Sequence, residues 1–182
     1  MKAIKLITIL LIFIQSSVVA GDKLNRTPSA IKFKSLSGSP KDTSAINALI
    51  RKGTKYFSSE YAKLDMAKTC IDSAILICEK KNIEVPARLH LLLAEYHFAT
   101  SDLRSASEEA SIAMKKAAGS GNSEDLARIN LFFGKYYHRT GFFKESIEYY
   151  ENAIAISKKE GLKGFIPISY LTIIPYYPGY SV

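Results

Sequence analysis

Residues 133–153, FGKYYHRTGFFKESIEYYENA, contain the pattern that decides the fold. They hold two motifs of large and small residues, Phe133-Gly134-x₂-Tyr137 and Ser146-x₃-Tyr150-x₂-Ala153. The spacing within each motif places its residues on one face of a helix. Between the two lies a turn at Thr140-Gly141-Phe142, where glycine tolerates a left-handed backbone. The segment therefore predicts two antiparallel helices that pack closely through small side chains.

Both motifs recur upstream at nearly constant steps. The first returns 40 residues earlier as Leu93-Ala94-x₂-His97. The triplet returns at steps of 40 and 39 residues, as Ala106-x₃-Ala110-x₂-Ala113 and Ala67-x₃-Ile71-x₂-Ala74. From Asp42 onward apolar residues recur at helical spacing, without the alternation of a strand. A fixed period of this length predicts an all-α repeat architecture built from helix pairs.

Turn and cap residues mark the expected helix ends. Asp102 can cap one helix start, and either Asn122 or Ser123 can cap another. Pro86 suits the beginning of a helix, where its missing N–H costs nothing. The expected C-terminal ends carry a residue suited to a left-handed cap, at Asn82, Gly119 and Gly161.

These motifs resemble the tetratricopeptide repeat, TPR, over about residues 43–174, with a period longer than the usual 34 residues. The resemblance implies a right-handed α-solenoid of antiparallel helix pairs over residues 43–165, with about three units. The first unit, about Thr43 to Asn82, is degenerate, although Gly53 and Tyr56 fit its first helix.

The N-terminus has the three regions of an export signal. Lys2 and Lys5 precede the apolar run Leu6–Ile14, and small residues follow, with the expected cleavage after Ala20. An uncleaved anchor is the alternative, although the apolar run is shorter than the ~20 residues that span a bilayer. Residues 1–20 therefore predict export, to a bacterial periplasm, and residues 21–42 read as a flexible leader. No stable membrane span is expected in the mature chain.

Residues 166–182 begin as another repeat, because Ile166-Pro167 stands two periods after Val85-Pro86. Pro175 and Pro178 then prevent a regular helix. This segment is either a capping helix with a Pro- and Tyr-rich tail or an incomplete repeat of a shortened chain. Long-period units after a signal peptide are similar to the sensor arms of bacterial TPR signalling proteins.

The composition limits the chemistry. The net charge is +8, and 47% of the 182 residues are hydrophobic, which indicates a globular chain. Cys70 and Cys78 stand eight residues apart on one expected helix, roughly 12 Å, which is too far for a bridge. They are expected as buried thiols, with an intermolecular disulfide as the alternative.

No catalytic motif is present in the sequence, so we expect neither an enzyme nor a cofactor or metal site. His97 is expected to be a structural histidine at a packing position between helices. Glu108 and Glu109 are expected on a solvated helix face.

The TPR resemblance implies a concave groove lined by the first helix of each unit. Carried over by position, its partner-binding residues are Arg88, Leu91, Glu95, Phe98, Arg128, Leu131, Lys135, His138 and Arg139. Four of these are Arg or Lys and one is Glu, which favours an acidic or carboxylate-bearing protein or peptide partner. Alternatively, the charges only keep an exposed face soluble. A different class of function is a polyanion or anionic-membrane binder driven by the positive charge, although nucleic acid is not the expected partner.

Overall fold

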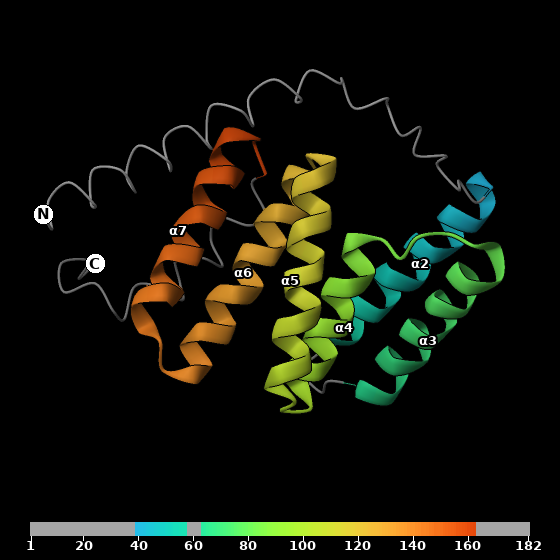
Figure 1. The fold of residues 1–182 in the computed structure, drawn as a ribbon, viewed down its shortest axis with the longest axis horizontal. Helices are drawn as coiled ribbons and strands as arrows, with labels where there is room; N and C mark the ends of the chain where they lie inside the picture. Colours follow the sequence, from blue (N-terminus) through green and yellow to red (C-terminus); the bar gives the residue numbers. More distant parts are fainter. Residues whose placement is uncertain (1–38, 58–62, 163–182) are drawn as a thin grey trace, which may run out of the picture. The chain divides into compact units, whose positions relative to one another are not determined.

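The computed structural model describes residues 39–57 and 63–162, and within these ranges it is all-helical, as predicted. Its six helices lie side by side in Figure 1. They are α2 (Pro40–Phe57), α3 (Leu64–Lys81), α4 (Ala87–Ala99), α5 (Leu103–Ser120), α6 (Ser123–Thr140) and α7 (Phe143–Lys159).

The helices pack as three consecutive hairpins. Each hairpin joins sequence neighbours, α2 with α3, α4 with α5, and α6 with α7, and these pairs make the most extensive contacts. Adjacent hairpins meet through α3 with α4 and α5 with α6. The first helices also contact one another, α2 with α4 and α4 with α6. One row of first helices is therefore continuous through the described part of the chain.

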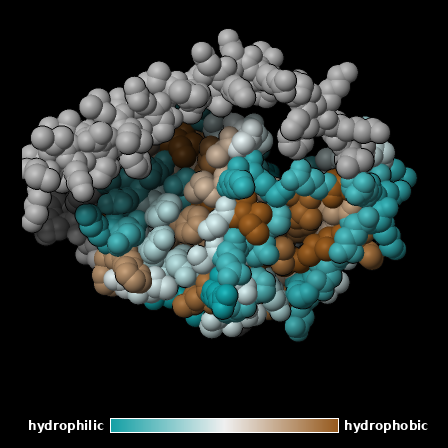
Figure 2. All heavy atoms as spheres, viewed as in Figure 1, coloured by the Kyte–Doolittle hydropathy of each residue, from teal (hydrophilic) through white to brown (hydrophobic). Residues whose placement is uncertain are grey.

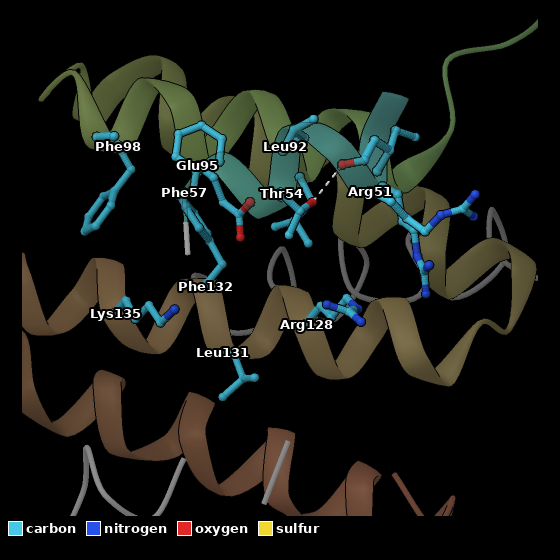
Figure 3. Close-up of a pocket in the computed structure, with 14 residues that line it drawn as sticks. Arg51, Thr54, Phe57, Leu92, Glu95, Phe98, Arg128, Leu131, Phe132 and Lys135 are labelled. Carbon is cyan, nitrogen blue, oxygen red and sulfur yellow. Dashed lines mark hydrogen bonds between the residues drawn. The ribbon is translucent and has the colours of Figure 1, made fainter. Parts of the chain in front are cut away.

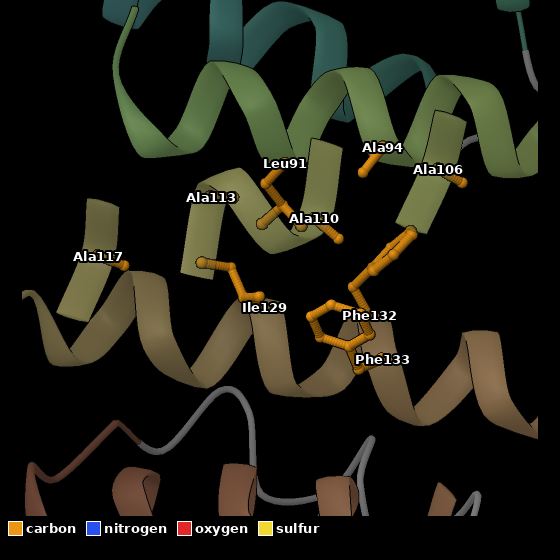
Figure 4. Close-up of a cluster of buried hydrophobic side chains, with 9 residues drawn as sticks. All are labelled: Leu91, Ala94, Ala106, Ala110, Ala113, Ala117, Ile129, Phe132 and Phe133. Carbon is orange, nitrogen blue, oxygen red and sulfur yellow. The ribbon is translucent and has the colours of Figure 1, made fainter. Parts of the chain in front are cut away.

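The recurring triplets lie in the interfaces, as the sequence predicts. All nine of their residues, on α3, α5 and α7, are buried. Figure 4 shows how the alanines of α5 let two neighbouring helices approach it, with Leu91 of α4 and Phe132 of α6 in the same cluster. Alanine side chains allow this close approach because they occupy little volume between two helix backbones.

Helices α6 and α7 approach each other closely at Gly134. A Cβ atom added to Gly134 would come within 2.6 Å of Cε1 of Tyr150, which is itself 1% exposed. Beside it, the Ser146 hydroxyl donates a 2.8 Å hydrogen bond to the Gly134 carbonyl. Ser146, which stands where the two earlier triplets have Ala67 and Ala106, therefore has a hydrogen-bond partner in an apolar interface.

The caps follow the sequence with one exception. Asp102 and Asn122 cap α5 and α6 by accepting hydrogen bonds from the backbone N–H groups of Ser105 and Asp125. The prediction that Gly119 ends a helix is wrong. Gly119 lies inside α5, and the left-handed residue is Gly121, with φ +65°. Helix formation continues for one more residue, Ser120, because Gly119 can adopt helical angles as well as left-handed ones.

Other left-handed positions agree with the expected turns. They are Asn82 at φ 51°, Gly141 at φ 85° and Gly161 at φ 68°. Ser101, in the turn between α4 and α5, is left-handed as well, with φ 67°. Pro86 precedes the first residue of α4, close to its expected place at a helix start.

Helix α2 begins at Pro40, three residues before the expected start of the repeats at residue 43. Proline fits this first helical position, because the N–H that it lacks would have no partner within the helix. The predicted signal peptide (1–20), most of the leader (21–42) and the C-terminal segment (166–182) lie outside the described residues.

Cys70 and Cys78 are both free and buried in α3, as expected for thiols that act as small hydrophobes. Burial raises the pKa of the Cys78 thiol.

In Figure 2 polar side chains cover the outer edge of α3, and apolar ones fill the strip between α3 and α5. None of the described helices combines the length and the apolar character needed to cross a bilayer.

The close contact at Gly134 predicts a stability effect with a built-in control. Gly134→Ala should lower the free energy of unfolding by about 1–3 kcal/mol, because the new methyl group overlaps the Tyr150 ring. Gly119→Ala should raise it by about 0.5–1 kcal/mol, since a Cβ there meets nothing within 4 Å and alanine favours a helix. Urea denaturation measures both. Equal effects of the two substitutions would contradict the packing.

Candidate binding groove

A cavity of about 620 Å³ opens between the three first helices (Figure 3). Helix α2 contributes Ile50, Arg51, Thr54 and Phe57. Helix α4 contributes Arg88, Leu91, Leu92, Glu95, Phe98 and Ala99. Helix α6 contributes Arg128, Leu131, Phe132 and Lys135. We call this cavity the groove.

Seven of the nine predicted partner-binding residues line the groove. They are Arg88, Leu91, Glu95, Phe98, Arg128, Leu131 and Lys135. Its floor is apolar because it is formed by Leu91, Leu131 and Phe132. Each of these side chains is less than 10% exposed. The Phe98 and Phe132 rings meet edge to face, with centroids 5.7 Å apart, and fix the shape of one end. The groove thus offers an apolar base between polar side chains.

Equivalent positions on the three helices face the groove together. Ile50, Leu91 and Leu131 recur at steps of 41 and 40 residues, and all three belong to the lining. Thr54, Glu95 and Lys135 recur at the same steps and also line it. The groove is therefore built by repetition, with one apolar and one polar position from each hairpin.

The arginines at one end are held by acidic neighbours. Arg88 pairs with Glu124, at 2.6 Å from Nη2 to Oε1, and also with Asp125. Arg128 donates to the same Glu124 oxygen, at 3.0 Å from Nη2. Burial would raise the pKa of Glu124, but the hydrogen bond from Arg128 and the charge of Arg88 hold it below its usual value.

These ion pairs change the expected role of Arg88. Arg88 is predicted to bind a partner, but its guanidinium also ties α4 to the first turn of α6. Arg51 adds a further cation to the lining, from α2, and its side chain is exposed. The lining therefore holds four cations and one Glu, as many as the predicted set, but Glu124 and Asp125 offset part of the charge of Arg88 and Arg128.

Glu95 supplies the acidic group of the described lining. Figure 3 shows its carboxyl directed from α4 into the space between the helices, with Phe57 beside it. Burial raises its pKa to about 7, although the charges of Lys135 and Arg128 act in the opposite direction. Near neutral pH this carboxyl is thus divided between its charged and neutral forms.

Two predicted residues do not line the groove. Arg139 donates to the Phe98 carbonyl and to the Ser101 hydroxyl, at 2.7 and 2.8 Å, and lies 4.8 Å above the centre of the Phe98 ring. It fastens the end of α6 to the turn between α4 and α5. His138 packs instead against Phe143 of α7, with ring centroids 5.7 Å apart.

Sequence reasoning missed the contribution of α2. Arg51, Thr54 and Phe57 line the groove, but the first unit is too degenerate for a match by motif. A signal was nevertheless present in Gly53, which stands 41 residues before Ala94. Carrying that register forward places Thr54 with Glu95 and Phe57 with Phe98.

His90 and His97 each lie beside an acidic side chain. Glu109 is half-buried rather than solvated, because its carboxylate lies 2.7 Å from Nδ1 of His90. Glu108 is exposed on the outer face of α5, as expected. His97 lies 3.4 Å from the Asp102 carboxylate beside the turn, in keeping with a structural role. In residues 39–57 and 63–162, no group of three His, Cys, Asp or Glu side chains could hold a metal ion.

No protein-family model matches the chain, and searches of curated proteins and of solved structures find no significant similarity to it.

The raised pKa of Glu95 predicts a pH-dependent contribution to stability. The folded chain holds this proton up to about pH 7, whereas the unfolded chain loses it near 4.5, so the contribution of Glu95 falls as pH rises through that window. Glu95→Gln should therefore be more stable than the original chain at about pH 8, by about 1–3 kcal/mol, with little difference at about pH 4.

Urea denaturation at both pH values measures this difference, and Glu108→Gln, on the outer face of α5, is the control. A stability difference that does not change between the two pH values would show that Glu95 is ionised as an ordinary surface carboxylate.

Proposed function

We propose that this chain is a non-catalytic, TPR-like scaffold that binds a protein or peptide partner in the groove. The observation that carries the proposal is that three successive hairpins contribute equivalent side chains to one cavity. Under this proposal the hairpins continue the repeat as a right-handed solenoid, and the row of α2, α4 and α6 is its concave face. A surface built by repetition suits an elongated ligand, such as an extended segment or a helix.

The side chains favour a partner that is both apolar and acidic. Leu91, Leu131 and Phe132 can bury apolar residues of the ligand at about 25 cal/mol per Å². Arg51 and Lys135 are exposed members of the lining, where they can donate charge-assisted hydrogen bonds to carboxylates. The partner segment is therefore expected to carry Asp or Glu beside its apolar residues.

The same arrangement favours a peptide over a polyanion as the ligand. Glu124 and Asp125 bind the guanidinium of Arg88 at the arginine end, and Glu95 adds negative charge in the lining. A nucleic acid or an anionic membrane surface requires a dense field of unneutralised cations. An apolar base with a few cations is better matched to a protein segment.

Export belongs to the proposal on sequence grounds alone. Residues 1–20 have the order of regions typical of a signal peptide, so we place the groove outside the cytoplasm. Because the sequence resembles bacterial sensor arms, we further propose that the partner belongs to a signalling system.

The proposal predicts which peptides the groove selects. Peptide-display selection on the purified chain should recover sequences that combine apolar residues with Asp or Glu. Arg51→Glu combined with Lys135→Glu should weaken the binding of a selected synthetic peptide by at least about tenfold in isothermal titration calorimetry, because the two exposed cations of the groove become repulsive.

Lys52→Glu with Lys144→Glu is the matched control, since both residues are exposed, lie outside the groove lining and give the same change in charge. Circular dichroism should show unchanged helicity in both double variants. Binding that survives in the groove variant, or that falls equally in the control, would refute the groove as the partner site.

A further inference from the structure

The Glu95 carboxyl lies in the groove beside Phe57 (Figure 3) and feels the charges of several cations. Lys135 and Arg128 face it from α6, Arg51 is part of the lining on α2, and Arg88 stands on its own helix. Helices α3 and α5 also pack against α4, but none of their described residues belongs to the lining. The state of this carboxyl is therefore set by the groove and by whatever fills it.

A partner in the groove would shift that state in one direction. Apolar residues seated on Leu91 and Phe132 would displace the water that solvates the Glu95 carboxylate, which disfavours its charged form. Carboxylates of the partner would repel the same charge. Both effects stabilise the protonated carboxyl, which can also donate a hydrogen bond to an oxygen of the ligand.

We propose that the groove takes up its acidic, apolar partner segment together with one proton, which is held on the Glu95 carboxyl. This inference rests on the proposed function and adds a condition to it, that binding weakens as the solution becomes alkaline.

The position of the titration makes the coupling effective near neutrality. Before a partner binds, the pKa of Glu95 is about 7. Above that pH most Glu95 carboxyls are ionised and must take up a proton when the partner binds. If only the neutral form binds, the affinity falls about tenfold between pH 6 and pH 8. A partner that placed a cation on Glu95 would show the opposite trend.

The test uses 1-anilinonaphthalene-8-sulfonate, whose rings are apolar and whose sulfonate stays ionised over this range. Fluorescence titration of the purified chain should show affinity falling about tenfold from pH 6 to pH 8. Glu95→Gln should bind equally well at both pH values, because its amide is always neutral. Glu108→Gln, outside the groove, should behave like the original chain.

Calorimetry in two buffers of different ionisation enthalpy measures the proton directly. At about pH 7 the original chain should take up about half a proton per probe molecule, and Glu95→Gln none. Urea denaturation of each variant at the same pH values verifies that the titrated protein is folded.

The outcomes separate the two proposals. If Glu95→Gln keeps the pH dependence of the original chain, or if the affinity of the original chain is constant or rises with pH, the proton coupling is overturned. The assignment of the groove as a binding site is retained in that case, provided that the double variant Arg51→Glu and Lys135→Glu lowers the affinity for the probe. Failure of the probe to bind, or binding that this pair leaves unchanged, would overturn both.

Discussion

The structure depends on the close approach of paired helices where a small side chain on one meets the other. In the third hairpin, Gly134 lies so near the Tyr150 ring that no Cβ fits between them. In the second, Ala94 is fully buried in one cluster with four alanines of α5, which are Ala106, Ala110, Ala113 and Ala117. Because interiors are densely packed, a larger residue at such a position would force the helices apart. This constraint holds each first helix in place, and the three first helices together form the groove.

Short-range patterns in the sequence predicted this framework well. The triplets on α3, α5 and α7 are buried, and Asp102 and Asn122 cap the helices that follow them. Such features depend on spacing within one or two helical turns, where backbone geometry fixes which residues share a face. Gly119 shows the limit of this approach, because a glycine near a helix end can adopt either helical or left-handed angles. The structure places the left-handed residue two positions later, at Gly121.

The groove was less completely predictable, because long polar side chains choose partners that are far away in sequence. Arg88, in the second hairpin, pairs with Glu124 and Asp125 in the third. Arg139 turns away from the groove to bind Phe98 and Ser101 near the neighbouring turn. A position in a repeat indicates the face of a helix, but the direction of a flexible side chain depends on the donors and acceptors within its reach. The groove residues of α2 could be found in the sequence only from Gly53, which stands 41 residues before Ala94 and is a weaker signal than the triplets.

The central claim is that the small residues sit directly against the facing helix, and nuclear magnetic resonance tests this claim most directly. In the folded chain, the Gly134 Hα protons should show strong nuclear Overhauser effects to the Tyr150 ring protons, together with chemical shifts displaced by the ring current. If these cross-peaks are absent while the helices are intact, α6 and α7 do not meet at this point. The packing from which the groove is derived would then be wrong.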